Sequence, residues 1–290
     1  MKKFIVIALA ALFFCSCQKE GQYSPNKKIA QIQNIYASES GYSTYSQSEI
    51  WHWDGRQLTA IDTYHDSALM ETLLFTYGSN KRLTKAVLTY KYATDTPDTY
   101  TFDYNGSQLT SIDMNNGEAT YSITHQDDHI SMLEIEYTRN TGYNHKALAW
   151  LLPREVAEAI AAGCQQHDTR TAKGGDSKEM AKKTIAMEWR KDNIVQIKIY
   201  GDDYSASYDL NYDKKRNPYY QSTADATILF DANTPPSRNN VLSVQAVEYR
   251  GNVKTSEYTL NYSYQYNGKY PVSVLRTTSS GTCTTYYEYL

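Results

Sequence analysis

The feature that most constrains the fold is a short unit that recurs along the chain: an aromatic residue, a polar turn and an aliphatic residue. Residues 53–61 read WDGRQLTAI and residues 104–112 read YNGSQLTSI. Weaker copies begin at Tyr77, His125, Trp189, Tyr212 and Tyr266. Steps of 24, 27 and 21 residues separate positions 53, 77, 104 and 125. Such steps are typical of one supersecondary unit repeated along a chain.

Each unit predicts a β-hairpin. The pairs Asp54-Gly55, Asn105-Gly106 and Asn267-Gly268 suit type I′ turns, in which both central residues have positive φ. The flanks alternate with period two: in 258–266, Tyr and Leu alternate with Thr, Asn, Ser and Gln. We predict an all-β fold, an antiparallel up-and-down meander of about a dozen strands or more. The meander forms either a closed or a partly open barrel.

Tyrosine is unusually frequent, with 28 residues against 6 Phe. Tyr suits a sheet whose core is filled by rings and whose edge meets water, so core packing accounts for most of them. Exposed rings on a rigid sheet can also stack on sugars. We therefore take Trp51, Trp53 and Trp189 as candidate ligand-binding residues, with packing in the core as the alternative.

One segment departs from the hairpin pattern. Residues 153–162 predict a helix, because Pro153 suits the first position, Glu155 complements the dipole and Gly163 can end it. A polar loop follows up to Lys183. We expect an insertion near 145–183 that packs against the barrel or plugs it.

The N-terminus predicts export. Two lysines precede an apolar stretch of 11 residues, Phe4 to Phe14, which is too short for a membrane span. Cys15-Ser16-Cys17 resembles a bacterial lipobox, and Ser16 makes Cys17 the expected lipid anchor. We expect a signal peptide at 1–16, a lipidated tether at 17–30 and one β-domain at 31–290. The alternative is an ordinary secreted protein.

These features together resemble a known family. The segment Gln18-Lys19-Glu20 resembles the tag that directs Bacteroidetes lipoproteins to the cell surface, although the usual tag has two acidic residues. With the Tyr-rich hairpins, the chain resembles Bacteroidetes lipoproteins that have a porin-like β fold, and more weakly the YD-type repeats of bacterial surface proteins. The resemblance covers about residues 30–290. It implies an outer-membrane lipoprotein exposed at the cell surface, and it carries over no catalytic residues.

Other polar clusters predict no metal or catalytic site. His125, Asp127, Asp128 and His129 contain metal-ligand types, but the repeat places them in a hairpin turn. Glu134 and Glu136 share the polar face of one strand, which predicts solvated charge rather than an acid–base pair. Cys164 and Cys283 are compatible with a disulfide outside the cytosol, although spacing does not establish one.

We therefore expect a non-enzymatic envelope lipoprotein that binds a glycan or an envelope protein, or serves as a scaffold. No cofactor is expected, and the membrane is a partner through the lipid anchor. A net charge of −3 without a basic stripe argues against nucleic-acid binding. The alternative is a hydrolase whose residues converge from separate hairpins. A membrane-spanning porin is disfavoured, because a lipid anchor would be redundant.

Overall fold

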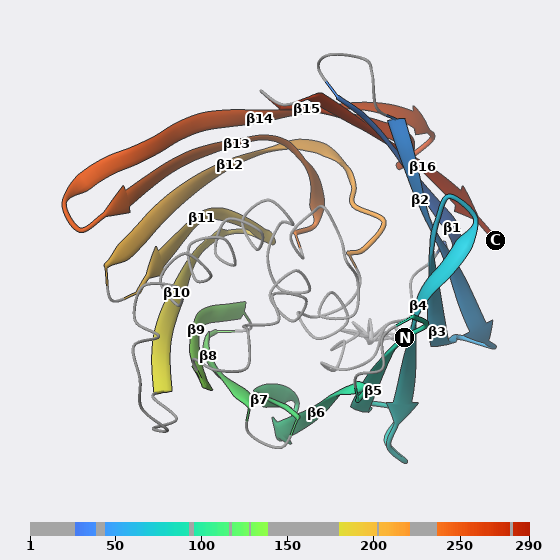
Figure 1. Ribbon diagram of the computed structural model, residues 1–290, viewed down its shortest axis with the longest axis horizontal. Coiled ribbons are helices and arrows are strands. Elements are labelled where there is room, and N and C mark those ends of the chain that lie inside the picture. The colour runs from blue at the N-terminus through green and yellow to red at the C-terminus, as the bar shows by residue number, and fades with distance from the viewer. Residues whose placement is uncertain are drawn as a thin grey trace, which may run out of the picture.

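The computed structural model describes residues 27–38, 44–92, 96–115, 118–127, 129–138, 180–201, 203–220, 237–278 and 281–290. They form sixteen β-strands in one closed antiparallel barrel (Figure 1). Each strand pairs with its neighbours in the sequence, and β1 pairs with β16. The strands are β1 Ile29–Ser38, β2 Thr44–Asp54, β3 Gln57–His65, β4 Ala68–Tyr77, β5 Leu83–Tyr90, β6 Asp98–Asn105, β7 Gln108–Met114, β8 Ala119–Gln126, β9 His129–Thr138, β10 Met180–Arg190, β11 Asn193–Tyr200, β12 Tyr204–Arg216, β13 Asn239–Arg250, β14 Val253–Asn267, β15 Tyr270–Thr278 and β16 Gly281–Tyr289.

The predicted all-β antiparallel meander is confirmed, and the sheet takes the closed form. The strand β1 begins at Ile29, inside the range expected for the tether. The helix expected at 153–162 lies outside the described residues, as does most of the expected insertion, because β9 ends at Thr138 and β10 starts at Met180.

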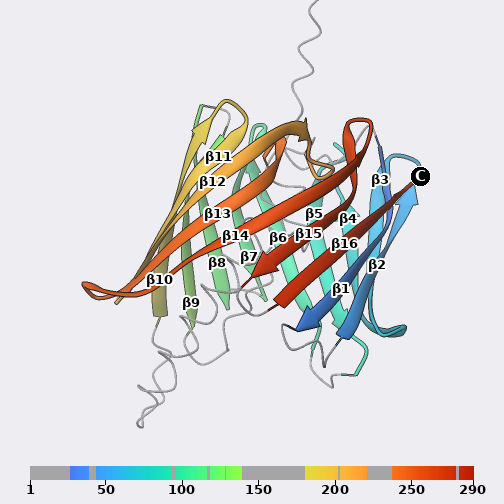
Figure 2. The ribbon, with the colours of Figure 1, turned by 90° about the horizontal axis from the view of Figure 1, so that it is seen from above.

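Alternate connections lie at opposite ends of the barrel, because consecutive strands run in opposite directions (Figure 2). The recurring units all join an even-numbered strand to the next odd-numbered one. Their turns therefore gather at one end, which we call the hairpin end. The start of β1 and the end of β16 lie at this end too. The connection from β9 to β10 belongs to the opposite end.

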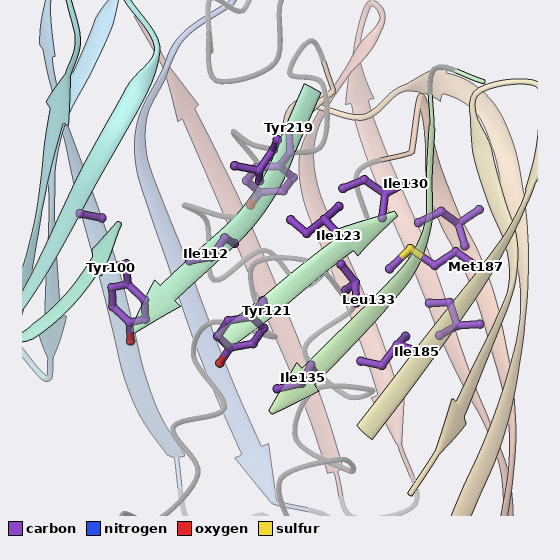
Figure 3. Close-up of a cluster of buried hydrophobic side chains, with 14 of the residues drawn as sticks. Tyr100, Ile112, Tyr121, Ile123, Ile130, Leu133, Ile135, Ile185, Met187 and Tyr219 are labelled. Atoms are coloured by element: carbon purple, nitrogen blue, oxygen red, sulfur yellow. The ribbon is translucent and has the colours of Figure 1, made fainter. Parts of the chain in front are cut away.

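The inward face of the wall carries the core. On β14, Leu260 and Tyr262 are buried, at 5% and 6% exposure, and Tyr258, Tyr264 and Tyr266 are partly buried. The alternate residues of that strand are exposed, namely Thr259, Asn261, Ser263 and Gln265. The predicted inward tyrosine face is thus confirmed. Figure 3 shows part of this inward layer on β7, β8 and β9: Ile112, Tyr121, Ile123, Leu133 and Ile135.

A recurring bond joins neighbouring hairpins at the hairpin end. In several hairpins a β-bulge immediately precedes the aromatic residue of the unit. A bulge re-aims the side chain that follows it. The aromatic tip then donates a hydrogen bond to the backbone carbonyl of the aliphatic residue in the preceding unit. The bonds are Tyr77 to Leu58 at 2.7 Å, Tyr104 to Leu83 at 2.8 Å, Trp189 to Ile130 at 2.6 Å and Tyr212 to Ile194 at 2.5 Å.

Cations lie over the aromatic ring at three of the glycine turns. In each, a basic residue that precedes the hairpin in the sequence places its side chain over the aromatic ring. The same side chain donates a hydrogen bond to the backbone carbonyl of the turn glycine. The three sets are Lys28 with Trp53 and Gly55, Arg82 with Tyr104 and Gly106, and Lys215 with Tyr266 and Gly268. The aromatic position thus has a structural role, because it links two hairpins through its ring face and its polar tip.

Gly106→Val should destabilise the protein by about 1–3 kcal/mol. Gly106 has a φ of 60°, which a β-branched residue resists. An added Cβ would meet no atom within 4 Å, so the cost comes from the backbone alone. Thermal unfolding of Gly106→Val and Gly106→Asn measures it, because Asn tolerates positive φ. Equal melting temperatures for the valine variant and the wild type would contradict the positive φ assigned to Gly106 in this turn.

Candidate functional site

A cavity of about 460 Å³ lies between the β8–β9 and β10–β11 hairpins at the hairpin end. It is lined by Gln126, Asp127, His129, Ser131, Met187, Glu188, Trp189 and Lys191. The cavity thus combines aromatic rings with a carboxylate, an amide, a hydroxyl and an ammonium group. This mixture of one apolar surface and several polar groups is typical of small-molecule sites.

The cavity forms because β9 and β10 stop pairing before they reach the hairpin end. Their last paired residues toward this end are Met132 and Ala186. Beyond them a bulge between Glu188 and Trp189 turns the indole toward β9, where its N–H donates to the Ile130 carbonyl. Figure 3 shows Ile130 and Met187 on these two flanking strands. The splayed backbone therefore leaves space that the Trp189 ring only partly fills.

The rings of Trp189 and His129 lie against each other, with centroids 4.5 Å apart and planes tilted by 41°. The Nε2 atom of His129 is 3.9 Å from Asp192 Oδ1. Asp192 also forms a 3.0 Å ion pair with Arg238. The imidazole thus lies near an aromatic ring and near a carboxylate that already has a cation.

The other candidate tryptophans lie on β2, away from this cavity. Trp51 is 4% exposed, and its indole N–H donates to buried Glu49 at 3.1 Å. Trp53 is partly buried, lies under the Lys28 ammonium and donates to the Ile29 carbonyl at 2.8 Å. The structure therefore brings together Trp189 and His129, but not the three tryptophans. Ligand binding by any of them stays a prediction.

The predicted cysteine sites remain untested. Cys283 is buried on β16, at 3% exposure. Cys17 and Cys164 lie outside the described residues, so lipidation and the disulfide stay predictions.

The polar clusters discussed for metal or acid–base chemistry are dispersed. His125 lies on the inward face of β8, whereas His129 lines the cavity. Glu134 and Glu136 lie on the outer face, where Glu134 and Lys182 form a 2.9 Å ion pair. The hydrogen bond that the Lys182 ammonium donates to Glu134 raises the pKa of Lys182 above its ordinary value. Among the described residues, no group of three or more His, Cys, Asp or Glu side chains is arranged to hold a metal ion.

Sequence reasoning missed one internal polar cluster. Glu49 is 4% exposed and accompanies Trp51 on the inward face of β2. The Tyr219 ring, just beyond β12, lies 6.3 Å from the Trp51 ring and 6.2 Å from the Tyr287 ring. Period two along β2 would have placed Glu49 on the side of Trp51. The local sequence around Tyr219 did not indicate that its ring would pack near Trp51 and Tyr287.

Charged side chains also occupy the outer wall. Glu134 and Asp209 lie near the middle of their strands and Lys198 lies two residues before the end of β11, each on the face opposite the buried residues.

Within the parts of the chain that the structure describes, no helix has the length and hydropathy of a membrane span.

Comparisons with known proteins show the fold. No protein-family model matches the chain, and no curated protein matches it. Among solved structures, it is similar to a porin-like protein from Bacteroides uniformis, with a TM-score of 0.52 and 12% identity over 90% of this chain and 98% of that one. A porin-like protein from Bacteroides vulgatus has a TM-score of 0.46 and 8% identity, over 91% of this chain and 99% of that one. The first likeness supports the expected porin-like barrel, at the level of fold alone.

Proposed function

We propose that this protein is a non-enzymatic envelope lipoprotein that binds a glycan in the cavity between the β8–β9 and β10–β11 hairpins. The observation that carries the proposal is the combination in one cavity of the Trp189 ring with Asp127, Glu188 and Gln126. Sugars offer an apolar ring face and a rim of hydroxyl groups. An aromatic ring can stack on the face, while carboxylate and amide groups accept and donate hydrogen bonds at the rim.

The outer wall supports a barrel that stands in water rather than one that spans a bilayer. A spanning barrel needs an apolar outer band about 25 Å tall, and a Lys or Arg at its midplane costs about 2–4 kcal/mol. Asp209 is exposed near the middle of β12, and Lys198 is exposed on neighbouring β11, two residues before that strand ends. Tyr and aliphatic residues line the opposite, inward face. A lipid on Cys17 would then supply the membrane attachment that the wall does not.

Glycan binding is tested by screening the protein on a glycan array and measuring the affinity of the best ligand by calorimetry. Trp189→Ala should weaken binding at least about tenfold, since about 1.4 kcal/mol of stacking corresponds to that factor. Trp189→Phe should keep part of the affinity, because a ring remains. Glu188→Gln should weaken binding without a change in stability, because this side chain is exposed.

The control is Trp53→Phe, which alters the same position of the repeat at a hairpin remote from the cavity. It should leave the affinity unchanged. If Trp53→Phe and Trp189→Phe weaken glycan binding equally, the loss reflects a general change in structure. If the glycan affinity is unchanged in all the cavity variants, the cavity is not the binding site.

Cys17→Ala should abolish lipidation. Several acyl chains on Cys17 would make anchoring effectively permanent, because each buried CH₂ contributes about 0.8 kcal/mol. Mass spectrometry of the variant should show no acylated species, and detergent phase partitioning should move it to the aqueous phase. Cys15→Ala is the matched control and should remain lipidated. An acylated Cys17→Ala protein would place the anchor elsewhere.

A further inference from the structure

The two ends of the barrel differ in charge. Among the described residues, in the connections and the four strand residues next to them, the basic side chains at the hairpin end are Lys27, Lys28, Arg56, Lys81, Arg82, Lys85, Arg190, Lys191, Lys214, Lys215, Arg216, Arg238 and Lys269, whereas the acidic ones are Asp54, Asp103, Asp127, Glu188, Asp192, Asp213 and Glu288. At the opposite end, counted in the same way, the described acidic residues are Asp62, Asp66, Glu71, Asp98, Asp113, Glu118, Glu136, Asp203 and Glu248, and the basic ones are Lys91, Lys182, Lys183, Lys198, Arg250, Lys254 and Arg276. The chain as a whole is slightly acidic, with a net charge of −3. Among the described residues, basic side chains therefore clearly outnumber acidic ones at the hairpin end, whereas the opposite end is close to balanced.

Part of this basic rim is available to a partner. Lys28, Arg82 and Lys215 donate hydrogen bonds to the glycine carbonyls of neighbouring turns, and Arg238 forms an ion pair with Asp192. Other members are exposed at the tips of turns, namely Arg56, Lys81, Arg190, Lys191, Lys214 and Lys269. They are spread around the barrel mouth from the β2–β3 turn to the β14–β15 turn. Such a ring presents a broad positive surface rather than a pocket for one anion.

The first described residues, which lead into β1, also lie at the hairpin end. The Lys27 ammonium lies 4.3 Å from the centre of the Tyr289 ring on β16, and β1 begins two residues later. Cys17 precedes Lys27 by ten residues, which span at most about 35 Å when fully extended. An anchor at Cys17 would therefore keep the basic rim, rather than the opposite end, close to the membrane.

We propose that the hairpin end docks on an anionic lipid bilayer through this basic rim. The proposal rests on the lipid anchor of the proposed function and adds an orientation to it. A basic residue close to an anionic bilayer is attracted to it, and the attraction decays within about 8 Å at physiological salt. The tether supplies the proximity that so short a range requires. Docking would bring the cavity near Trp189 beside the headgroups, so glycans borne by lipids would lie within its reach.

The experiment uses the full lipidated protein in vesicles of phosphatidylcholine alone or of phosphatidylcholine mixed with phosphatidylglycerol. The vesicles contain a trace of dansyl-labelled headgroups, and energy transfer from tryptophan reports how close the hairpin end lies. Trp53 and Trp189 are built-in donors, because both belong to this end. The rim variant is Arg56→Glu, Lys214→Glu and Lys269→Glu combined. The matched control is Lys91→Glu, Lys198→Glu and Lys254→Glu, which changes the charge equally at exposed sites toward the opposite end of the barrel.

We expect strong transfer on the anionic vesicles for the wild type and the control, and a fall of at least about twofold for the rim variant or at high salt. Equal transfer on both lipids, or equal transfer for the rim variant and the control, would overturn the docking surface. Vesicle flotation reports the anchor separately. If the chain does not float, the anchor has failed, and sedimentation with the same vesicles then tests the rim. Binding to anionic lipid should in that case weaken at least about tenfold in the rim variant only.

Discussion

Raising the pH above about 10 should unfold the barrel cooperatively, because buried tyrosine hydroxyls resist ionisation. Burial raises the pKa above the ordinary value of 10.0 for Tyr100, Tyr208, Tyr219, Tyr262 and Tyr287. For several of them, nearby tyrosines and carboxylates add to the effect. At Tyr208, for example, burial comes first, and Tyr204, Tyr258 and Glu248 contribute further.

The direction follows from proton linkage. A tyrosine with a raised pKa keeps its proton in the folded chain at a pH where the unfolded chain has lost it. Its contribution to stability is fully present below the unfolded pKa near 10, and is lost as the pH rises toward the folded pKa. Each such tyrosine lowers the free energy of unfolding by about 1.4 kcal/mol per pH unit in that window. Several acting together would exhaust the 5–15 kcal/mol typical of a domain within one or two pH units.

Denaturant titrations at a series of pH values, followed by circular dichroism and tyrosinate absorbance, measure this loss. Tyr208→Phe removes one buried hydroxyl and should make the decline shallower by about 1.4 kcal/mol per pH unit. Tyr286→Phe removes a hydroxyl from a side chain that is 47% exposed, and should keep the wild-type profile. Gradual ionisation of all tyrosines in a chain that stays folded would contradict the buried positions.

The hairpins could be predicted because their signals are local. At Gly55, Gly106 and Gly268 the positive φ that the turn requires is present in the structure. Period two on β14 likewise predicted which side chains face inward, because a register slip of one residue would place polar side chains in the core. The regular alternation of turns also places every recurring unit at the same end, once the sheet is known to be a meander.

Closure of the barrel had no comparable signal. It depends on pairing β1 with β16, where the Thr285 hydroxyl donates to the Asn34 side chain at 2.6 Å across 251 residues of sequence. Neither residue belongs to a recognisable motif. Contacts so distant in sequence depend on the number and tilt of all the strands between them.

The candidate site was predicted only in part. Trp189 was singled out as an aromatic residue at a repeat position, and His129 for its place in a His-Asp cluster. Their encounter at 4.5 Å results from the point where β9 and β10 stop pairing, and the sequence does not specify this point. The cation over each ring was missed for the same reason, since Arg82 belongs to one hairpin and Tyr104 to another.

Tyr262→Ala should destabilise the barrel by about 3–5 kcal/mol, like other aromatic truncations in a core. Tyr262 is 6% exposed on the inward face of β14, where it pairs with Arg276 of β15. Removing the ring would leave a void that the closed wall cannot collapse to fill, because each strand is fixed by hydrogen bonds on both sides. Chemical denaturation of the purified variant measures the loss.

Tyr286→Ala is the matched control, because it removes the same ring from the outer face of β16 at 47% exposure. In water this change should cost less than about 1 kcal/mol, since the ring is already largely solvated. The pair of variants therefore separates two kinds of barrel. A wall that stands in water depends on its inward tyrosines and tolerates loss of the outward ones, whereas a spanning wall depends on an apolar outer band. A large cost at Tyr286 with a small one at Tyr262 would reverse the faces assigned here, and would remove the reason for a separate lipid anchor.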